Sequence, residues 1–249
     1  MSVQTATTEQ VNPHPLPRGE GTRLSTILGW VTAVLMALSL YAIFLYAPIE
    51  RTQGPPQKIF YFHVPLAWDA YLAFFCTLVG SIAYLRTAKP KWDVLAYSAA
   101  EIGVVFTTLV LISGSIWGKT IWGAWWAWDA RLTSTLVMWF IYVAYLMLRS
   151  SLGRTTVRAA RYAAVLGIVG FIDVPIVHMS VSWWRTLHPQ PTVANPAGPS
   201  LPASMLATFF LCFVTFTIFF VWLLRERMAV EYLRHEVDAL ATSVLESES

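Results

Sequence analysis

Charged residues are scarce in this chain of 249 residues. Only 12% of them are Asp, Glu, Lys or Arg, against about 25% in soluble domains, and 56% are hydrophobic. Together with long apolar runs, this shortage excludes a soluble globular domain of any size and indicates an integral membrane protein. The runs do not show the alternating pattern of a membrane β-barrel, so the sequence predicts helices.

Cysteine is also rare, because Cys76 and Cys212 are the only two, and both fall within apolar runs. We interpret them as packing residues rather than as a disulfide or metal pair. A cleaved signal peptide is not recognisable either. Residues 1–22 are polar and Pro-rich, and no apolar run is followed by a small-residue cleavage site. The first helix is therefore expected to act as an uncleaved anchor.

Six apolar runs are long enough to cross about 30 Å of hydrocarbon as helices. The predicted spans are residues 24–47, 65–85, 94–116, 132–148, 162–181 and 204–224. The expected fold class is all-α, a polytopic membrane protein with six transmembrane helices. The expected domains are a polar N-terminal tail (1–23), a membrane domain (24–224) and a C-terminal helix or tail (225–249).

The distribution of Lys and Arg predicts the orientation. One set of flanks holds twelve of the 17 basic residues, and the other holds Arg51, Lys58, Lys119, Arg131 and Arg185. Both termini are therefore expected to be cytoplasmic. The loops 48–63, 117–131 and 182–203 are expected on the opposite face, which in a bacterial cell is periplasmic or extracellular. The net charge of +3 then reflects the inward loops and does not indicate nucleic-acid binding.

The stretch WGAWWAWDARLTS at 122–134 lies in one of these outer loops. A belt of interfacial aromatic residues is one interpretation, since Trp favours the headgroup level. The other is a platform for a flat ligand, because small residues between large rings allow close approach and indole N–H groups add polar anchors. Arg131 and Lys119 are suited to carboxylates. Haem, a flat ligand with carboxylates, therefore fits this description, and quinones fit it with less need for the cations. The loop carries five tryptophans: Trp117, Trp122, Trp125, Trp126 and Trp128.

Two of the five histidines belong to the same outer face. His63 comes just before the second span, where Pro65 suits the first turn of a helix. His188 follows Trp183 and Trp184 in the loop between the fifth and sixth spans. Histidines from separate loops can ligate one iron from opposite sides, although a single outer histidine is usually just solvated.

The other three histidines are expected to be less important. His14 and His235 lie in the polar tails. His178 lies about one turn inside the outer end of the fifth span, where we interpret it as an interfacial residue. The alternative for His178 is a supporting role beside the site.

These residues carry a resemblance to a known family. The motif WGxWWxWDxRLT at 122–133, together with HVP at 63–65 and SWWRTLHP at 182–189, resembles the tryptophan-rich WWD-domain proteins of cytochrome c biogenesis. With six spans, the chain is most similar in pattern to the haem exporter protein C (CcmC) family. The resemblance covers roughly residues 24–224.

The resemblance implies a cofactor, a site and partners. It implies haem b at the outer leaflet, ligated by His63 and His188 and held against the tryptophan motif with Asp129 and Arg131. It implies that haem is attached covalently to the haem chaperone CcmE. It also implies work beside the ATPase CcmA, the permease CcmB and the small single-span protein CcmD, in the bacterial inner membrane.

Three acids and the C-terminal tail have open interpretations. Asp69, Glu101 and Asp173 fall within apolar spans, where an acid is either protonated or paired in the bundle, or has a function. Asp173 precedes Pro175, which favours a kink. Apolar residues recur every three or four positions over 230–244. They predict a helix that continues the sixth span and packs on something, although a frayed tail is the alternative.

Three functions remain open at this point. The preferred one is a haem-binding component that presents haem at the periplasmic face, without an enzymatic activity of its own. A haem conduit across the bilayer would need coordinating groups at several depths, whereas both candidate ligands lie at one level. A b-type electron carrier would place histidine pairs within two helices.

Overall fold

The computed structural model describes residues 20–189, 193 and 201–248 of the chain. Apart from one β-bridge between Glu50 and Gly54, the described residues form helices and the turns between them. Six of the helical stretches are long and apolar enough to span a membrane, which confirms the predicted fold class. These stretches are Arg23–Tyr46, Pro55–Thr87, Pro90–Trp122, Ala130–Ser151, Val157–Trp183 and Ala203–Leu245.

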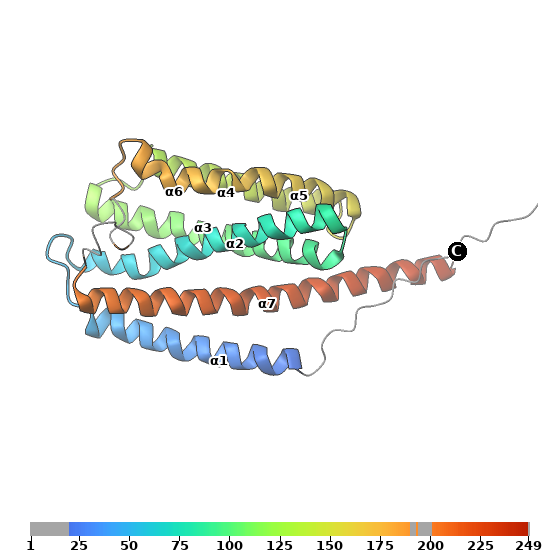
Figure 1. Ribbon diagram of the computed structural model, residues 1–249, viewed down its shortest axis with the longest axis horizontal. Helices are drawn as coiled ribbons and strands as arrows, with labels where there is room; N and C mark the ends of the chain where they lie inside the picture. Colours follow the sequence, from blue (N-terminus) through green and yellow to red (C-terminus); the bar gives the residue numbers. More distant parts are fainter. Residues whose placement is uncertain (1–19, 190–192, 194–200, 249) are drawn as a thin grey trace, which may run out of the picture.

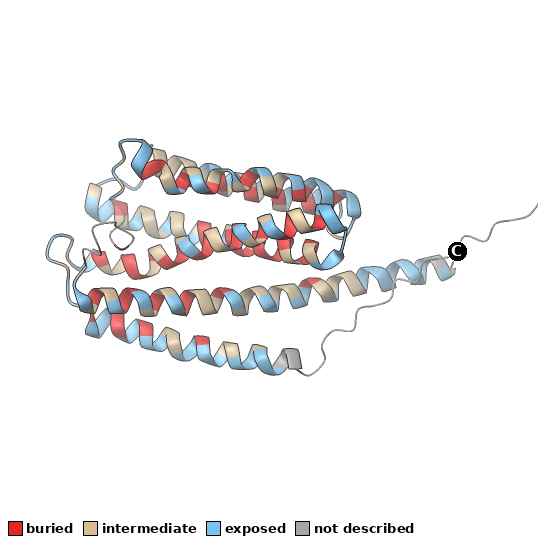
Figure 2. Ribbon diagram, viewed as in Figure 1, coloured by how far each residue is buried: buried red, intermediate tan, exposed pale blue. Residues whose placement is uncertain are grey.

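The helices run side by side along the long axis of the molecule (Figure 1). In Figure 1, α7 lies between α1 and the pair α2 and α3, and α4, α5 and α6 cover the other side of that pair. Buried residues follow the faces that the helices turn towards each other (Figure 2). The helices are α1 (Glu20–Tyr41), α2 (Phe60–Thr87), α3 (Pro90–Trp122), α4 (Ala130–Ser151), α5 (Val157–Phe171), α6 (Asp173–Trp183) and α7 (Ala203–Glu248).

Aromatic packing holds the centre of the bundle together. The rings of Phe74 on α2 and Tyr142 on α4 stack with their centroids 3.7 Å apart. A Cβ at Gly103 on α3 would lie 2.4 Å from the Phe74 ring, so only glycine permits this approach. The large residues of this core are buried, whereas many apolar side chains on the outside are exposed, as expected for a surface that faces lipid.

The start of α2 differs from the prediction. A 3₁₀ turn, Pro55–Ile59, leads directly into α2, which begins at Phe60. His63 therefore lies in the first turn of the helix and not before it, and Pro65 lies within the helix. The prediction that the helix begins at Pro65 was wrong, because the two prolines of the 3₁₀ turn begin helical structure earlier.

The helix α3 also extends beyond its predicted end. It continues to Trp122 and is ended by Gly123, whose φ of +76° favours glycine. Trp117 and Trp122 are therefore helical, and the non-helical part of the tryptophan segment is confined to 123–129. Asp129 then caps α4, because its side chain accepts a hydrogen bond from the Leu132 N–H.

The fifth span is broken, as Pro175 predicts. The helix α5 ends at Phe171, and α6 begins at Asp173 after the single residue Ile172. Pro175 has no N–H to donate to the carbonyl of Phe171, four residues earlier, which explains the position of the break.

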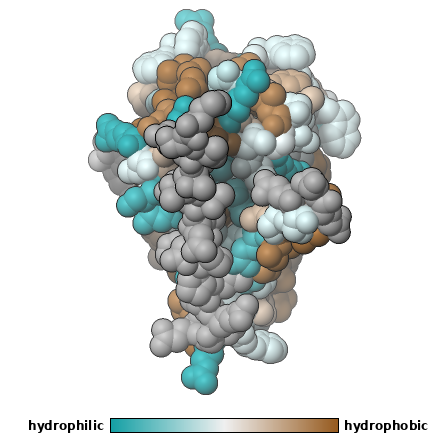
Figure 3. All heavy atoms as spheres, turned by 90° about the vertical axis from the view of Figure 1, so that its right-hand side faces the viewer, coloured by the Kyte–Doolittle hydropathy of each residue, from teal (hydrophilic) through white to brown (hydrophobic). Residues whose placement is uncertain are grey.

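The sixth span continues as one helix far beyond the membrane segment, since α7 extends to Glu248 and projects past the bundle (Figure 1). The helix predicted to continue the sixth span is present over these residues, and its packing on a partner stays a prediction. The side chains that form its apolar stripe are about half or more exposed: Val230, Leu233, Val237, Leu240 and Val244. We call this end of the molecule the tail end, and Figure 3 shows hydrophilic side chains spread over it.

Candidate functional site

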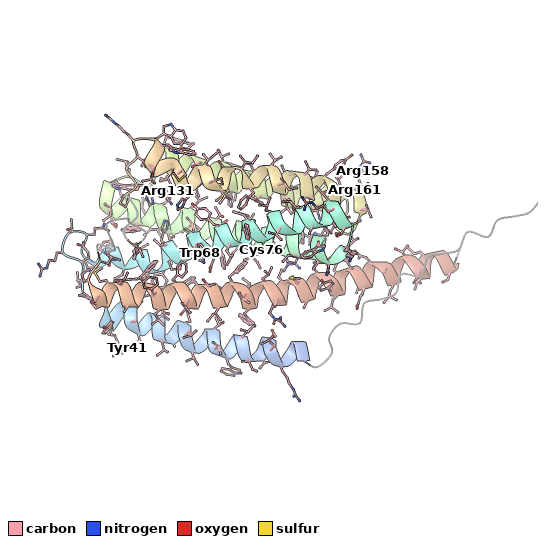
Figure 4. All side chains as sticks on the ribbon, in the orientation of Figure 1. Tyr41, Trp68, Cys76, Arg131, Arg158 and Arg161 are labelled. Atoms are coloured by element: carbon pink, nitrogen blue, oxygen red, sulfur yellow. The ribbon has the colours of Figure 1, made fainter. Side chains whose placement is uncertain are left out.

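A cavity of about 250 Å³ lies at the end of the bundle opposite the tail end. This is far more than the roughly 10–15 Å³ that one buried water requires. Arg131 contributes to its wall, and Figure 4 shows Arg131 at the opposite end of the molecule from Arg158 and Arg161. The residues that line it come from α2 and the segment before it, from α3 and α4, and from the segment after α6. They include His63, Tyr71, Gly114, Trp117, Gly118, Trp122, Trp126, Arg131 and His188.

His63 is a buried side chain of α2 that is oriented by α3. Its Nδ1 lies 2.9 Å from the Ser113 Oγ, which itself donates a hydrogen bond to the Leu109 carbonyl at 2.7 Å. Because the hydroxyl proton of Ser113 is used on that carbonyl, Nδ1–H of His63 is the donor between the two side chains. The lone pair of Nε2 is then free to bind a metal.

Gly114 makes room for this histidine. A Cβ at position 114 would lie 3.0 Å from the His63 Cε1, tighter than ordinary van der Waals contact. The Trp117 ring meets the His63 ring edge to face, with the centroids 5.8 Å apart. The Trp117 N–H donates to the Gln53 Oε1 at 3.1 Å. Together, α3 and the turn before α2 fix where the His63 ring lies.

His188 reaches the same cavity from the segment after α6. Its Nδ1 lies 3.3 Å from the Pro189 carbonyl, and a carbonyl only accepts, so Nδ1 carries the proton and Nε2 is again the free nitrogen. Burial lowers the pKa of His188 to about 4, and the nearby Arg131 guanidinium contributes to this shift. The imidazole is therefore neutral at physiological pH, which is the form that ligates metals.

Arg131 lies in the first turn of α4 and interacts with the Tyr71 hydroxyl of α2, which also lines the cavity. Tyr71 is not among the residues predicted for the site. The only signal for it is its place two turns after His63 on the same helix, a spacing that puts both side chains on one face. The guanidinium, two imidazoles and a phenol thus meet at one apolar cavity.

The tryptophans divide into two groups. Trp117, Trp122 and Trp126 line the cavity, and the Nε1–H of Trp126 is buried without a hydrogen-bond partner among the described residues. The other four predicted tryptophans do not line it and are exposed by half or more of their surface: Trp125, Trp128, Trp183 and Trp184. A role of these four in ligand binding remains a prediction.

Asp129 does not line the cavity either, and both of its carboxylate oxygens have protein partners. Oδ1 accepts from the Leu132 N–H at 2.8 Å. Oδ2 accepts from the Thr186 hydroxyl at 2.5 Å and from the Leu187 N–H at 3.2 Å. The tryptophan segment is thus joined to the segment that carries His188.

Neither of the other two histidines in the described part of the chain lines the cavity. His178 is exposed on α6, although its ring contacts Tyr71 with the centroids 6.5 Å apart. His235 lies on the tail part of α7, and His14 is outside the described residues. Within the described ranges, His, Cys, Asp and Glu side chains form no group of three or more that is placed to hold a metal ion.

The membrane-embedded acids have different environments. Glu101 forms an ion pair with Arg227, so it is paired within the bundle. Asp69 is fully buried, and neither of its carboxylate oxygens has a hydrogen-bond partner among the described residues. Asp173 lies at the break between α5 and α6, and its Oδ2 is likewise buried without such a partner.

The fold and this site define a multi-pass helical membrane protein with an aromatic cavity at one end, into which two imidazoles and a guanidinium point. Comparison with known proteins identifies the family. Residues 11–243 match the family described as Heme exporter protein C (CcmC), and the chain belongs to this family.

Individual relatives agree with this assignment. The chain is 40% identical to heme exporter protein C of Bradyrhizobium diazoefficiens over 217 residues, which cover 86% of this chain and 82% of that protein. It is 34% identical to heme exporter protein C of Haemophilus influenzae over 220 residues, 86% of this chain and 87% of the relative. It is 37% identical to the Escherichia coli K12 protein of that name over 173 residues, 67% and 70% of the two chains.

Proposed function

We propose that this protein holds haem b between His63 and His188 and presents it for covalent attachment to the haem chaperone CcmE. The observation that carries the proposal is the convergence of two imidazoles and Arg131 on one cavity walled by tryptophan. Membership of the CcmC family implies a role in cytochrome c maturation, and the proposal gives that role a site.

The donor set of the cavity fits haem in its centre. The hydrogen bonds to the Ser113 hydroxyl and to the Pro189 carbonyl keep the proton of each imidazole on Nδ1. Both Nε2 lone pairs are therefore free. A haem supplies four equatorial nitrogens of its own, so two protein nitrogens complete the coordination of its iron. Two histidines are therefore sufficient where a bare metal ion would need more protein ligands.

The walls of the cavity fit the rest of the haem molecule. Its lining is mostly apolar, as a flat macrocycle requires. Gly114 and Gly118 on α3 have no side chains that would occupy the cavity. Arg131 is suited to a propionate because a guanidinium binds carboxylates through two parallel hydrogen bonds. The unpartnered Nε1–H of Trp126 offers a further donor to the ligand.

The placement of the site supports presentation over the two rival functions. Both histidines lie at the same end of the bundle, whereas a conduit needs coordinating groups along its length. His63 is helical, but His188 comes from a non-helical segment, unlike the helical histidine pairs of a b-type electron carrier. We therefore keep transport and electron transfer as alternatives without a supporting observation.

The proposed setting is the bacterial inner membrane, with the cavity facing the periplasm and both termini in the cytoplasm. The basic residues that flank the spans at the tail end support this orientation. CcmA, CcmB and CcmD are proposed as partners in the same complex. Reporter fusions at Ser151 and near Ser249 should read cytoplasmic and fusions near Gly123 exported, and the opposite result at Gly123 would refute the orientation.

The function is tested with protein purified in detergent. The wild-type protein should show the absorption spectrum of haem with two histidine ligands and should pass haem to added CcmE. The double variant His63→Ala with His188→Ala should retain little haem, while His235→Ala should match the wild type. Normal haem delivery by the double variant would refute the proposal.

A further inference from the structure

Asp129 connects two parts of the chain that are far apart in sequence. Its Oδ2 accepts hydrogen bonds from the Thr186 hydroxyl at 2.5 Å and from the Leu187 N–H at 3.2 Å, which lie 57 and 58 positions further along the chain. A carboxylate acceptor makes these hydrogen bonds stronger than neutral ones. The segment after α6 is thereby fixed to the start of α4.

The connection continues to His188. The Thr186 Oγ1, while donating to Asp129, accepts the backbone N–H of His188 at 3.1 Å. One hydroxyl thus links the carboxylate to the residue that carries the imidazole. Leu187, His188 and Pro189 all line the cavity, although the stretch after Trp183 is not helical.

We infer that Asp129 and Thr186 are positioning residues that hold the 186–188 segment so that His188 faces the cavity. The inference rests on the proposed function only for the role of His188 as a ligand, because the tether itself is a property of the protein. It gives the aspartate of the tryptophan motif a different role from direct contact with the cofactor. Arg131, two residues later, faces the cavity while Asp129 faces the segment.

The substitution Asp129→Asn separates the tether from the helix cap. Asparagine caps helices as well as aspartate does, so its amide oxygen keeps the bond to the Leu132 N–H. Its NH₂ group then replaces Oδ2 and cannot accept from Thr186 or Leu187. Thr186→Val removes the hydroxyl at almost constant shape, whereas Thr186→Ser keeps a hydroxyl at this position.

The first measurement uses the haem-free protein and the rate at which diethyl pyrocarbonate modifies each histidine, resolved by peptide mass spectrometry. Modification of His188 should be about tenfold faster in Asp129→Asn and Thr186→Val, the factor that corresponds to loss of one charge-assisted hydrogen bond. Thr186→Ser should behave as the wild type. Modification of His63 should be unchanged in all variants, because Ser113 and not Asp129 holds that ring.

An unchanged rate at His188 in Asp129→Asn would overturn the inference. An equal increase at His63 and His188 would also overturn it, because that result means general loosening of the fold.

The second measurement is the absorption spectrum after haem is added, with His188→Ala as the reference. Both tether variants should shift the spectrum towards that of His188→Ala, and Thr186→Ser should not. If His188→Ala leaves the spectrum unchanged while the labelling result holds, the tether stands and the ligand assignment in the proposed function fails. If His188→Ala changes the spectrum but Asp129→Asn does not, the tether fails and the ligand assignment stands.

Discussion

The two ends of the bundle are stabilised in different ways. At the cavity end, aromatic rings, glycines and hydrogen bonds that are not ion pairs surround an open space. At the tail end, charges are buried and paired: Arg149 bonds to Asp93 at 2.8 Å, and Arg227 pairs with Glu101 and Glu231. Among the described residues, every ion pair lies in the tail half of the molecule.

The tail end thus holds the helices together through paired charges, while the cavity end keeps a cation that a ligand can bind. The guanidinium groups of Arg149, Arg154 and Arg227 all lie over the Tyr97 ring, 5.3–5.6 Å from its centroid, which ties α3 and α4 to the tail part of α7. The single guanidinium at the cavity, Arg131, has no carboxylate partner in the described part of the chain. A cation without an ion pair is available to an acidic ligand.

The largest effect is expected from breaking the charge pairing at the tail end. Arg149 is fully buried, so Arg149→Ala leaves Asp93 buried without its partner. The free energy of unfolding should fall by about 3–5 kcal/mol, measured by denaturant titration in detergent. The double variant Asp93→Leu with Arg149→Met should recover most of the loss, and a single variant as stable as the wild type would contradict this account.

A smaller effect is expected at the cavity, where Trp126→Ala removes part of the wall. Loss of a stacking face is worth about 1–3 kcal/mol, so haem affinity should fall about five- to more than a hundredfold, measured by haem titration. Trp128→Ala is the matched control, because this ring is 78% exposed and does not line the cavity. Equal losses of affinity in the two variants would indicate that the tryptophans act as a general aromatic surface and that Trp126 has no special role as a wall of the cavity.

Gly114→Ala tests how closely the His63 ring is fitted. The added methyl group would lie 3.0 Å from Cε1 of His63 and should push the ring, at a cost of about 1 kcal/mol. The haem absorption maximum should shift, while Gly29→Ala on α1, with 3.4 Å to the nearest atom, should leave it unchanged. Identical spectra for the two variants would mean that the ring has room to move.

The smallest effect on the protein itself is expected from the exposed stripe on α7. Leu233→Asp with Leu240→Asp should change the free energy of unfolding by no more than about 0.5 kcal/mol for each substitution, because both side chains are exposed. Haem binding should also be unchanged. We propose that recovery of the partner subunits with the purified protein decreases, and unchanged recovery would refute a role of the stripe in packing on a partner.

Hydrophobic patterning predicted the large features of this fold well. The six spans, the break before Pro175 and the continuous helix at the tail all follow from local properties of the chain, namely run length, a missing N–H and a regular apolar spacing. The exact start of α2 was less predictable, because the Pro55–Ile59 turn extends helical structure into a segment that reads as a loop.

The inner contacts of the site were harder to predict because they join distant parts of the chain. The sequence singled out His63 and His188, but not Ser113, Gly114 or Thr186, which orient them. Residue type also does not show which side of a segment faces a cavity, so Trp126 and Trp128 were equivalent in the sequence. Asp93 was missed because it lies just before the predicted third span, although it is buried and paired with Arg149.

A comparison of two single variants tests whether His63 and His188 hold the iron between them. The absorption spectra of haem-loaded His188→Ala and His178→Ala should be recorded side by side in detergent. We expect His188→Ala to lose the spectrum of two histidine ligands and His178→Ala to keep it, since His178 does not line the cavity. Loss in His178→Ala with retention in His188→Ala would contradict the account and place the iron deeper in the bundle.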